Sequence, residues 1–169
     1  MPQPKIDLGF ATSDDVAAVA AVIQEAARWI ATWRSELWDP ALVGEAFVAP
    51  HVAQGQMLTA RTGGEIAGVM IMLTKDLLFW PDDPPGEAVY LHKLAVRRAY
   101  SGLGLPATLM DYAEKLARAQ DRHVLRLDCD PPLTAFYERL DFRQVDEIDA
   151  DHPEAGPMRV ARMERRAAA

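Results

Sequence analysis

The segment LHKLAVRRAYSGLGLP, residues 91–106, decides the fold of this chain. It begins as an apolar strand, passes through a turn with two glycines, and opens into an amphipathic helix. The first backbone N–H groups of a helix have no partner inside the helix, and the helix dipole is positive at that end. Glycines at 102 and 104 let a phosphate approach the backbone closely. The sequence therefore predicts that a phosphate-bearing ligand binds at residues 101–106.

The composition narrows the class of protein. A length of 169 residues, half of them apolar and a quarter charged, is typical of one soluble globular domain, expected to span residues 1–169. The net charge of −7 disfavours a nucleic-acid partner and favours cationic substrates such as amines. The longest apolar stretch, near residues 67–73, is too short to cross a membrane. Because Cys129 is the single cysteine, we expect no disulfide, no cysteine-based metal site and a cytoplasmic location.

The spacing of apolar residues predicts a mixed sheet of the α/β or α+β class. The predicted order is a strand, one or two helices, three antiparallel strands, and then helices alternating with strands. Strands are expected at residues 6–10, 56–61, 65–74, 88–96, 124–129, 142–148 and 158–163. Helices are expected at residues 12–30, 41–53, 105–119 and around 133–140, with loops at 33–40, 79–86 and 149–157 and a solvated tail from 165.

Three segments carry a family resemblance. Residues 94–96 (LAV) followed by 101–106 (SGLGLP) look like a pyrophosphate-binding loop, and residues 125–129 (LRLDC) look like the strand beside it. Residues 133–142 (LTAFYERLDF) are similar to an aromatic helix and the start of the next strand. Together they resemble the GNAT superfamily of acetyl-CoA-dependent N-acetyltransferases. The specific match covers about residues 88–145, and upstream it rests on element order.

The resemblance implies a mostly antiparallel central sheet flanked by helices, with a parallel strand pair that splays apart. Acetyl-CoA, as the acetyl donor, would lie in that gap, with its pantetheine arm on the first strand and its pyrophosphate on the helix that starts near residue 105. The implied cofactor-binding residues are Leu94, Ala95, Val96, Arg97, Arg98, Ser101, Gly102, Leu103, Gly104, Leu105, Pro106, Asp128 and Phe136.

Two positions of the loop depart from the family pattern. Ser101 stands where the family has Arg or Gln, and Pro106 stands where it has Gly or Ala. Proline has no N–H, so one phosphate donor is missing, and such a bond contributes about 0.5–1.5 kcal/mol. Arg97 and Arg98 would supply positive charge instead. The loop before the aromatic helix is also short and lacks the family's asparagine, and Asp141 stands where glycine usually ends that helix.

Acetyl transfer by direct attack needs a neutral amine, a polarised thioester carbonyl and an acid for the leaving thiolate. By its place in the family motif, Tyr137 is the candidate acid, although its apolar neighbours also fit a core position. His92 is the candidate base, because histidine ordinarily titrates at about pH 6.5 and this one lies on the cofactor-binding strand. Three alternatives to this role stay open. His92 is simply hydrogen-bonded on the face of the sheet, Glu87 is the base, or a water relay removes the proton.

Aromatic and acidic residues cluster between the first two helices. Trp29, Trp33 and Trp38 with Glu36 and Asp39 would form an acceptor wall suited to a cationic amine. The same tryptophans equally fit anchors that hold a loop to the core.

The sequence thus predicts an enzyme that acetylates a primary amine of a small molecule or peptide in a ternary complex. A degenerate acyl-CoA-binding or regulatory domain is the first alternative, favoured by Ser101, Pro106 and the short loop at residues 130–132. A dinucleotide-binding enzyme is the second, although antiparallel strands before the glycine turn argue against it. Cys129 is expected to be a buried strand residue, and no metal, nucleic acid or membrane partner is expected. Dimers are common in the family, and the sequence leaves the oligomeric state open.

Overall fold

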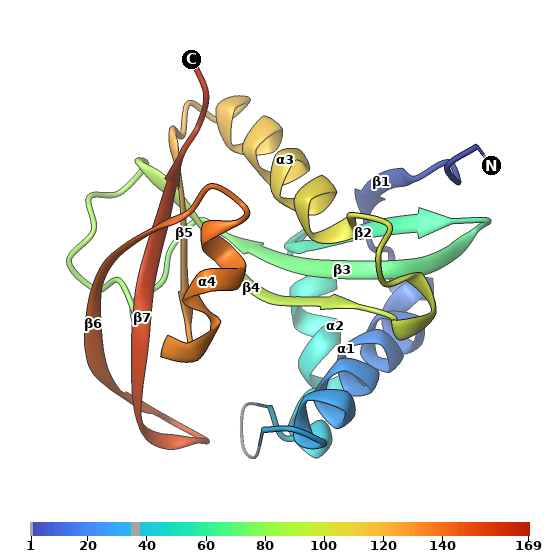
Figure 1. Ribbon diagram of the computed structural model, residues 1–169, viewed down its shortest axis with the longest axis horizontal. Helices are drawn as coiled ribbons and strands as arrows, with labels where there is room; N and C mark the ends of the chain where they lie inside the picture. The colour runs from blue at the N-terminus through green and yellow to red at the C-terminus, as the bar shows by residue number, and fades with distance from the viewer. Residues whose placement is uncertain (1, 35–37) are drawn as a thin grey trace. The chain divides into compact units, whose positions relative to one another are not determined.

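The computed structural model describes residues 2–34 and 38–169, and the chain divides into two compact units. The first unit is residues 1–71 with 93–109, and the second is residues 72–92 with 110–169. Hydrogen bonding gives the strand order β1-β2-β3-β4-β5-β7-β6 (Figure 1). Strands β4 and β5 pair in parallel, whereas β1–β2, β2–β3, β5–β7 and β6–β7 pair antiparallel. The mixed, mostly antiparallel sheet predicted from the sequence is confirmed.

The elements follow the predicted order. The strands are β1 (Asp7–Phe10), β2 (Met57–Thr62), β3 (Glu65–Leu73), β4 (Ala88–Val96), β5 (Val124–Cys129), β6 (Arg143–His152) and β7 (Gly156–Arg166). The α-helices are α1 (Val16–Ala31), α2 (Glu45–Ala53), α3 (Leu105–Arg118) and α4 (Thr134–Glu138). Helix α2 begins four residues later than predicted, because the short turn η2 (Pro40–Leu42) comes first and Gly44 caps the helix.

In the first unit, β1, β2 and β3 form an antiparallel sheet that α1 and α2 cover on one side (Figure 1). The two-residue turn Gly63-Gly64 joins β2 to β3 with φ of 58° and 84°, as a tight hairpin requires. The stripe of α1 that meets the core is fully buried at Val19, Val22 and Ile23. Apolar residues at helical spacing therefore place this helix as predicted.

The start of α3 packs against β3 at a glycine. A Cβ added to Gly68 would lie 3.4 Å from Leu109 Cδ1 and 3.4 Å from the carbonyl oxygen of Ala95. Glycine at this position therefore lets the first turns of α3 and the end of β4 approach β3 closely.

The second unit holds the start of β4 with β5, β7, β6 and α4. The loop after β3 lies against the face of β4 and β5 that carries their even-numbered residues. A buried cluster joins this loop to the strands: Phe79, Trp80, Ala88, Tyr90, Val124 and Val160. The proline-containing loop predicted at 79–86 is thus confirmed as a loop, and its aromatic residues belong to the core.

A buried arginine organises the charges of this face. Arg126 on β5 lies 2.7 Å from Asp83, 3.4 Å from Glu87 and 3.5 Å from Glu164. Its guanidinium also lies 5.1 Å from the ring centre of Trp80. Arg126 therefore supplies positive charge to three carboxylates, of which Glu164 also pairs with Arg143.

The predicted ends of the last two strands are wrong. Strand β6 continues to His152 and β7 runs from Gly156 to Arg166, so the expected loop at 149–157 shrinks to a tight turn. Cross-strand ion pairs support the extension, because Arg159 contacts Glu147 at 2.9 Å and Asp149 at 3.0 Å. The expected tail also begins later, since β7 ends at Arg166.

No described helix combines the length and apolar character needed to cross a bilayer. The single domain over residues 1–169 stays a prediction.

Replacing Arg126 with alanine should destabilise the fold strongly. The side chain is 90% buried beside Asp83 and Glu164, and breaking a buried ion pair costs about 3–5 kcal/mol because it leaves charges without a partner. Arg159→Ala removes an exposed arginine from the same unit and should change the stability little. Urea unfolding of both variants measures the difference, and equal losses would contradict the role given to Arg126.

Candidate active site

The turn between β4 and α3 has the backbone that an anion site needs. Gly102 and Gly104 have φ of 85° and 71°, which disfavour any residue with a side chain. A Cβ added at either position would meet nothing within 4 Å. The backbone conformation, and not crowding by the protein, therefore demands glycine here, and the space above both residues is open to a ligand.

Helix α3 begins directly after this turn. Gly104 accepts the N–H of Thr108 at 3.1 Å, which is the first bond of the helical ladder. The N–H groups at the first positions of a helix have no partner within it, and Pro106 contributes none. The positive end of a 14-residue helix thus faces the glycine turn, with one donor fewer than usual.

The turn is fixed to α1 and β3. The N–H of Arg98 donates to Glu25 Oε1 at 2.9 Å, and the Arg98 guanidinium lies 4.0 Å from the ring centre of Trp29. The Tyr100 hydroxyl donates to Glu65 Oε2 at 2.7 Å. Arg98 is therefore engaged by the protein itself, which weakens its predicted role as a source of charge for the ligand.

Arg97 differs from Arg98. Its N–H donates to the Ala67 carbonyl at 2.9 Å, which holds the backbone on β3. Its Nε is buried and has no hydrogen-bond partner in the described part of the chain. A buried donor in this state favours an anion as its partner.

Strand β4 changes conformation before the residues expected to bind the cofactor. The parallel ladder pairs Ala88–Leu91 with Val124–Leu127, and Lys93 then takes a φ of 52°. Such a φ is uncommon in a residue with a side chain and interrupts a regular strand. It precedes the predicted pantetheine-binding backbone at residues 94–96. The predicted splaying of the two strands stays a prediction.

The described residues of the predicted acceptor wall have different contacts. Trp29 and Trp33 pack edge to face with their ring centres 5.4 Å apart, and both are substantially exposed. Trp38 instead receives the ammonium of Lys93 at 5.0 Å from its ring centre. Asp39 accepts the N–H of Ala41 and so caps a short helical turn. Glu36 lies outside the described residues.

Tyr137 lies on α4 among aromatic rings of the second unit. The ring centres of Phe136 and Phe142 are 5.0 Å and 6.1 Å away. Burial raises the pKa of the Tyr137 phenol far above its ordinary value, and the nearby Cys129 and Asp128 contribute in the same direction. The phenol is therefore neutral at all physiological pH values and holds a proton that it can donate.

Cys129 is buried and chemically quiet. Its Sγ lies 3.8 Å from Met163 Sδ. Burial, with a smaller contribution from Asp128, raises the pKa of the thiol to about 12. Cys129 is thus the buried strand residue predicted from the sequence.

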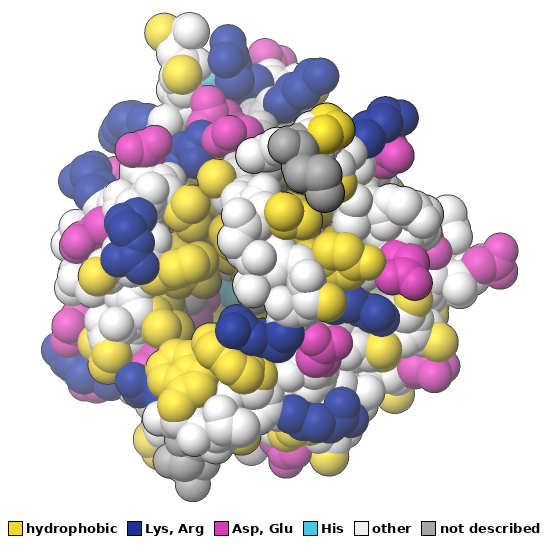
Figure 2. All heavy atoms as spheres, turned by 45° about the vertical axis from the view of Figure 1, so that its right-hand side comes forward, with side chains coloured by type: hydrophobic (Ala, Val, Ile, Leu, Met, Phe, Trp, Pro, Cys, Tyr) yellow, Lys and Arg dark blue, Asp and Glu magenta, His cyan; other side chains and the backbone are white. Residues whose placement is uncertain are grey.

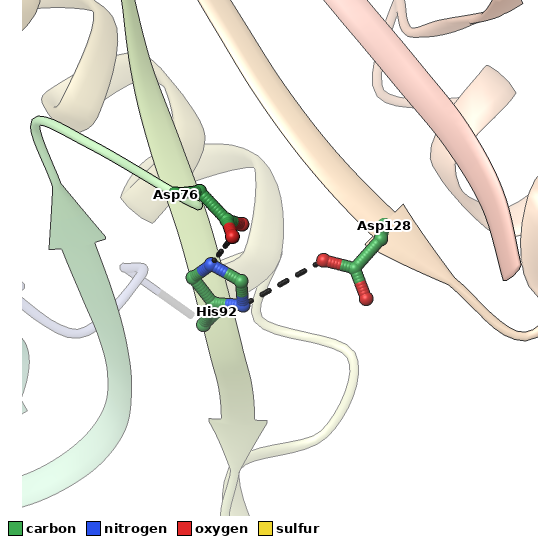
Figure 3. Close-up of side chains that lie close together, drawn as sticks. All are labelled: Asp76, His92 and Asp128. Carbon is green, nitrogen blue, oxygen red and sulfur yellow. Dashed lines mark ion pairs between the residues drawn. The ribbon is translucent and has the colours of Figure 1, made fainter. Parts of the chain in front are cut away.

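His92 lies between two carboxylates in the second unit (Figure 3). Its Nε2 is 3.0 Å from Asp76 Oδ2, and its Nδ1 is 3.7 Å from Asp128 Oδ1. Sequence reasoning missed Asp76, which lies three residues after the end of β3. One signal was present, because an aspartate often accepts the backbone N–H groups two and three residues later. Asp76 does so with Leu78 and Phe79.

Acidic and basic side chains are interspersed on the face drawn in Figure 2.

The comparisons with known proteins agree with this picture. The sequence model of the acetyltransferase (GNAT) family matches residues 23–142. The chain is 28% identical over 141 residues to the Bacillus subtilis (strain 168) protein named "Uncharacterized N-acetyltransferase YesJ", and the alignment covers 78% of each protein.

Two solved structures show the same fold. A GNAT-family acetyltransferase from Listeria monocytogenes 4b F2365 has a TM-score of 0.73 at 23% identity, covering 95% of this chain and 94% of that one. The yncA protein of Salmonella typhimurium, solved with its cofactor acetyl-CoA, has a TM-score of 0.66 at 16% identity, covering 98% and 95%.

Cys129 should react slowly with thiol reagents in the folded protein. At pH 8 we expect a rate about a hundredfold or more below that of the urea-unfolded chain, because burial removes both access and thiolate. Ser101→Cys in a Cys129→Ala background supplies an exposed thiol as the control. Reaction of native Cys129 at the rate of this control would show that the thiol is accessible.

Proposed function

Because the chain belongs to the acetyltransferase (GNAT) family, we propose that it transfers the acetyl group of acetyl-CoA to a primary amine by direct attack in a ternary complex. The observation that carries the proposal is the turn at Gly102 and Gly104, which opens α3 within the matched region. The presence of acetyl-CoA in the similar yncA structure supports the same donor.

The residues of the turn fit a pyrophosphate. Open space above Gly102 and Gly104, the N-terminus of α3 and the buried Nε of Arg97 all favour an anion. The backbone of residues 94–96, with the turn residues Ser101 to Pro106, would hold the donor as the resemblance implies. Arg97 supplies the positive charge that Ser101 lacks.

Tyr137 is the proton donor in this proposal. The departing CoA thiolate must gain a proton, and the Tyr137 phenol, which is protonated at physiological pH, can donate one. The rings of Phe136 and Phe142 pack beside it.

His92 is the proposed base. Its imidazole lies on β4, four residues or fewer from the proposed pantetheine-binding backbone, and faces Asp128 on β5. Glu87 is less suited to this role, because its carboxylate is already engaged by the guanidinium of Arg126 at 3.4 Å.

An acetyl-CoA-dependent assay tests the activity. The protein is mixed with acetyl-CoA and a panel of small-molecule and peptide amines, and release of the CoA thiol is followed with a thiol reagent. Amine-dependent release at a rate above that of hydrolysis supports the proposal. Acetyl-CoA binding by calorimetry without release for any amine would instead support the non-catalytic acyl-CoA-binding alternative. Absence of binding at millimolar acetyl-CoA would contradict both.

Tyr137→Phe should lower kcat by about a hundredfold while leaving the dissociation constant of acetyl-CoA unchanged. The variant keeps the ring and its aromatic contacts and removes only the proton donor. Tyr112→Phe on α3 removes a hydroxyl from a helix outside the proposed chemistry and serves as the control. Unchanged kcat with a lowered melting temperature would make Tyr137 a core residue.

Pro106→Ala should tighten acetyl-CoA binding by about two- to tenfold. Alanine restores an N–H in the first turn of α3, and one neutral hydrogen bond contributes about 0.5–1.5 kcal/mol. Pro153→Ala, in the turn between β6 and β7, controls for the general effect of removing a proline. Calorimetry gives both affinities, and equal affinity for all three proteins would place the phosphate away from residue 106.

A further inference from the structure

The turn after β3 holds the carboxylate of Asp76 beside His92. Its Oδ1 accepts the N–H groups of Leu78 at 3.2 Å and Phe79 at 3.0 Å, so the turn after β3 fixes the carboxylate. The residue is 8% exposed. Its other oxygen, Oδ2, lies 3.0 Å from His92 Nε2. In the described part of the chain, neither of these two buried atoms has another hydrogen-bond partner. The two buried atoms are thus placed for each other.

The same turn supports the imidazole from a second direction. The ring centre of Phe79 is 6.3 Å from that of His92. Burial favours the protonated form of Asp76, but His92 and the N–H groups of Phe79 and Leu78 outweigh it and hold the pKa of Asp76 below its ordinary value. Asp76 is therefore a buried carboxylate whose charge is directed at one nitrogen of His92.

The arrangement suits a proton better than a metal ion. Asp76, His92 and Asp128 offer ligand atoms within 4.8 Å of one another. However, the two carboxylates face different nitrogens of the ring, whose lone pairs point in diverging directions. An ion on either nitrogen would gain only one of these carboxylates, whereas zinc sites use three or four protein ligands. A carboxylate on each nitrogen is instead the arrangement that orients a base.

We propose that Asp76 is a positioning residue that keeps the proton of His92 on Nε2, so that Nδ1 is the base and Asp128 attracts the acceptor as a cationic primary amine. This inference rests on the proposed acetyl transfer. Charged groups face His92 from the loop after β3 and from β5, and two further titratable groups, Tyr137 and Cys129, neighbour Asp128.

Every proton of the proposed reaction has a donor and an acceptor. The ammonium gives one proton to His92 Nδ1, and the neutral amine forms a bond to the acetyl carbon as the bond from that carbon to sulfur breaks. Tyr137 protonates the thiolate and recovers a proton from the new amide nitrogen. His92 then releases its proton to water, so each turnover releases one proton.

Histidine NMR tests the positioning without any substrate. Long-range correlations between ring protons and nitrogens show which nitrogen carries the proton, and His92→Gln assigns the signals among the four histidines. We expect the Nε2–H tautomer in the wild type and a loss of this preference in Asp76→Asn. The same tautomer in both proteins would overturn the role of Asp76, whatever the enzyme's activity.

Kinetics test the consequence for the reaction. Asp76→Asn should lower kcat about tenfold or more and leave the KM for acetyl-CoA unchanged. Asp76→Glu should restore part of kcat, and Asp149→Asn, an exposed carboxylate on β6, should match the wild type. An equal loss of kcat in Asp76→Asn and Asp76→Glu, or a raised KM for acetyl-CoA, would indicate a merely structural role.

The acceptor and metal assignments have separate readouts. Asp128→Asn should raise the KM for the amine about tenfold or more. Equivalent KM values would overturn the assignment of Asp128.

Titration with Zn²⁺ by calorimetry should show no stoichiometric site, and one equivalent bound in the wild type but not in Asp76→Asn would overturn the proton-relay geometry. Absence of acetyl transfer with an Asp76-dependent tautomer would reject the proposed function and retain only the positioning.

Discussion

The parallel register of β4 on β5 is the constraint on which the second unit depends. Ala88 pairs with Val124 and Leu91 with Leu127, so the next residues along the two strands are His92 and Asp128. Since side chains alternate across a strand, Tyr90 and Arg126 lie on the same face as this pair. One register thus brings a histidine, a carboxylate, a phenol and a guanidinium to a single face of the sheet.

A face this polar needs a cover that satisfies it, and the loop after β3 provides one. Asp83 accepts the hydroxyl of Tyr90 at 2.6 Å and meets Arg126 at 2.7 Å. Trp80 lies between two guanidinium groups, with Arg126 at 5.1 Å and Arg162 at 4.6 Å from its ring centre. Buried charges left without partners would cost several kcal/mol each, far more than an exposed pair contributes. The loop's acids and aromatics are therefore as necessary to the unit as its apolar strands.

Local chemistry explains which parts of the fold could be read from the sequence. Gly63-Gly64 and the glycines at 102 and 104 mark turns because the backbone there needs a positive φ, and Asp141 likewise takes a φ of 66° where α4 ends. Strand β6 was predicted too short because its charged, half-exposed residues find partners on β7, which no local pattern shows. Asp76 was missed for a related reason: its partner His92 lies 16 residues away, and only the folded loop brings them together.

The two carboxylates around His92 also expose a conflict that any amine acetyltransferase must resolve. Negative charge draws an ammonium from water, and the chain's net charge of −7 acts in the same direction at long range. The same charge stabilises the ammonium once bound and so opposes the loss of the proton that must precede attack. In the proposed reaction the two roles fall on opposite sides of the imidazole, because Asp128 faces Nδ1 and Asp76 faces Nε2. Attraction and proton removal are thereby assigned to different carboxylates.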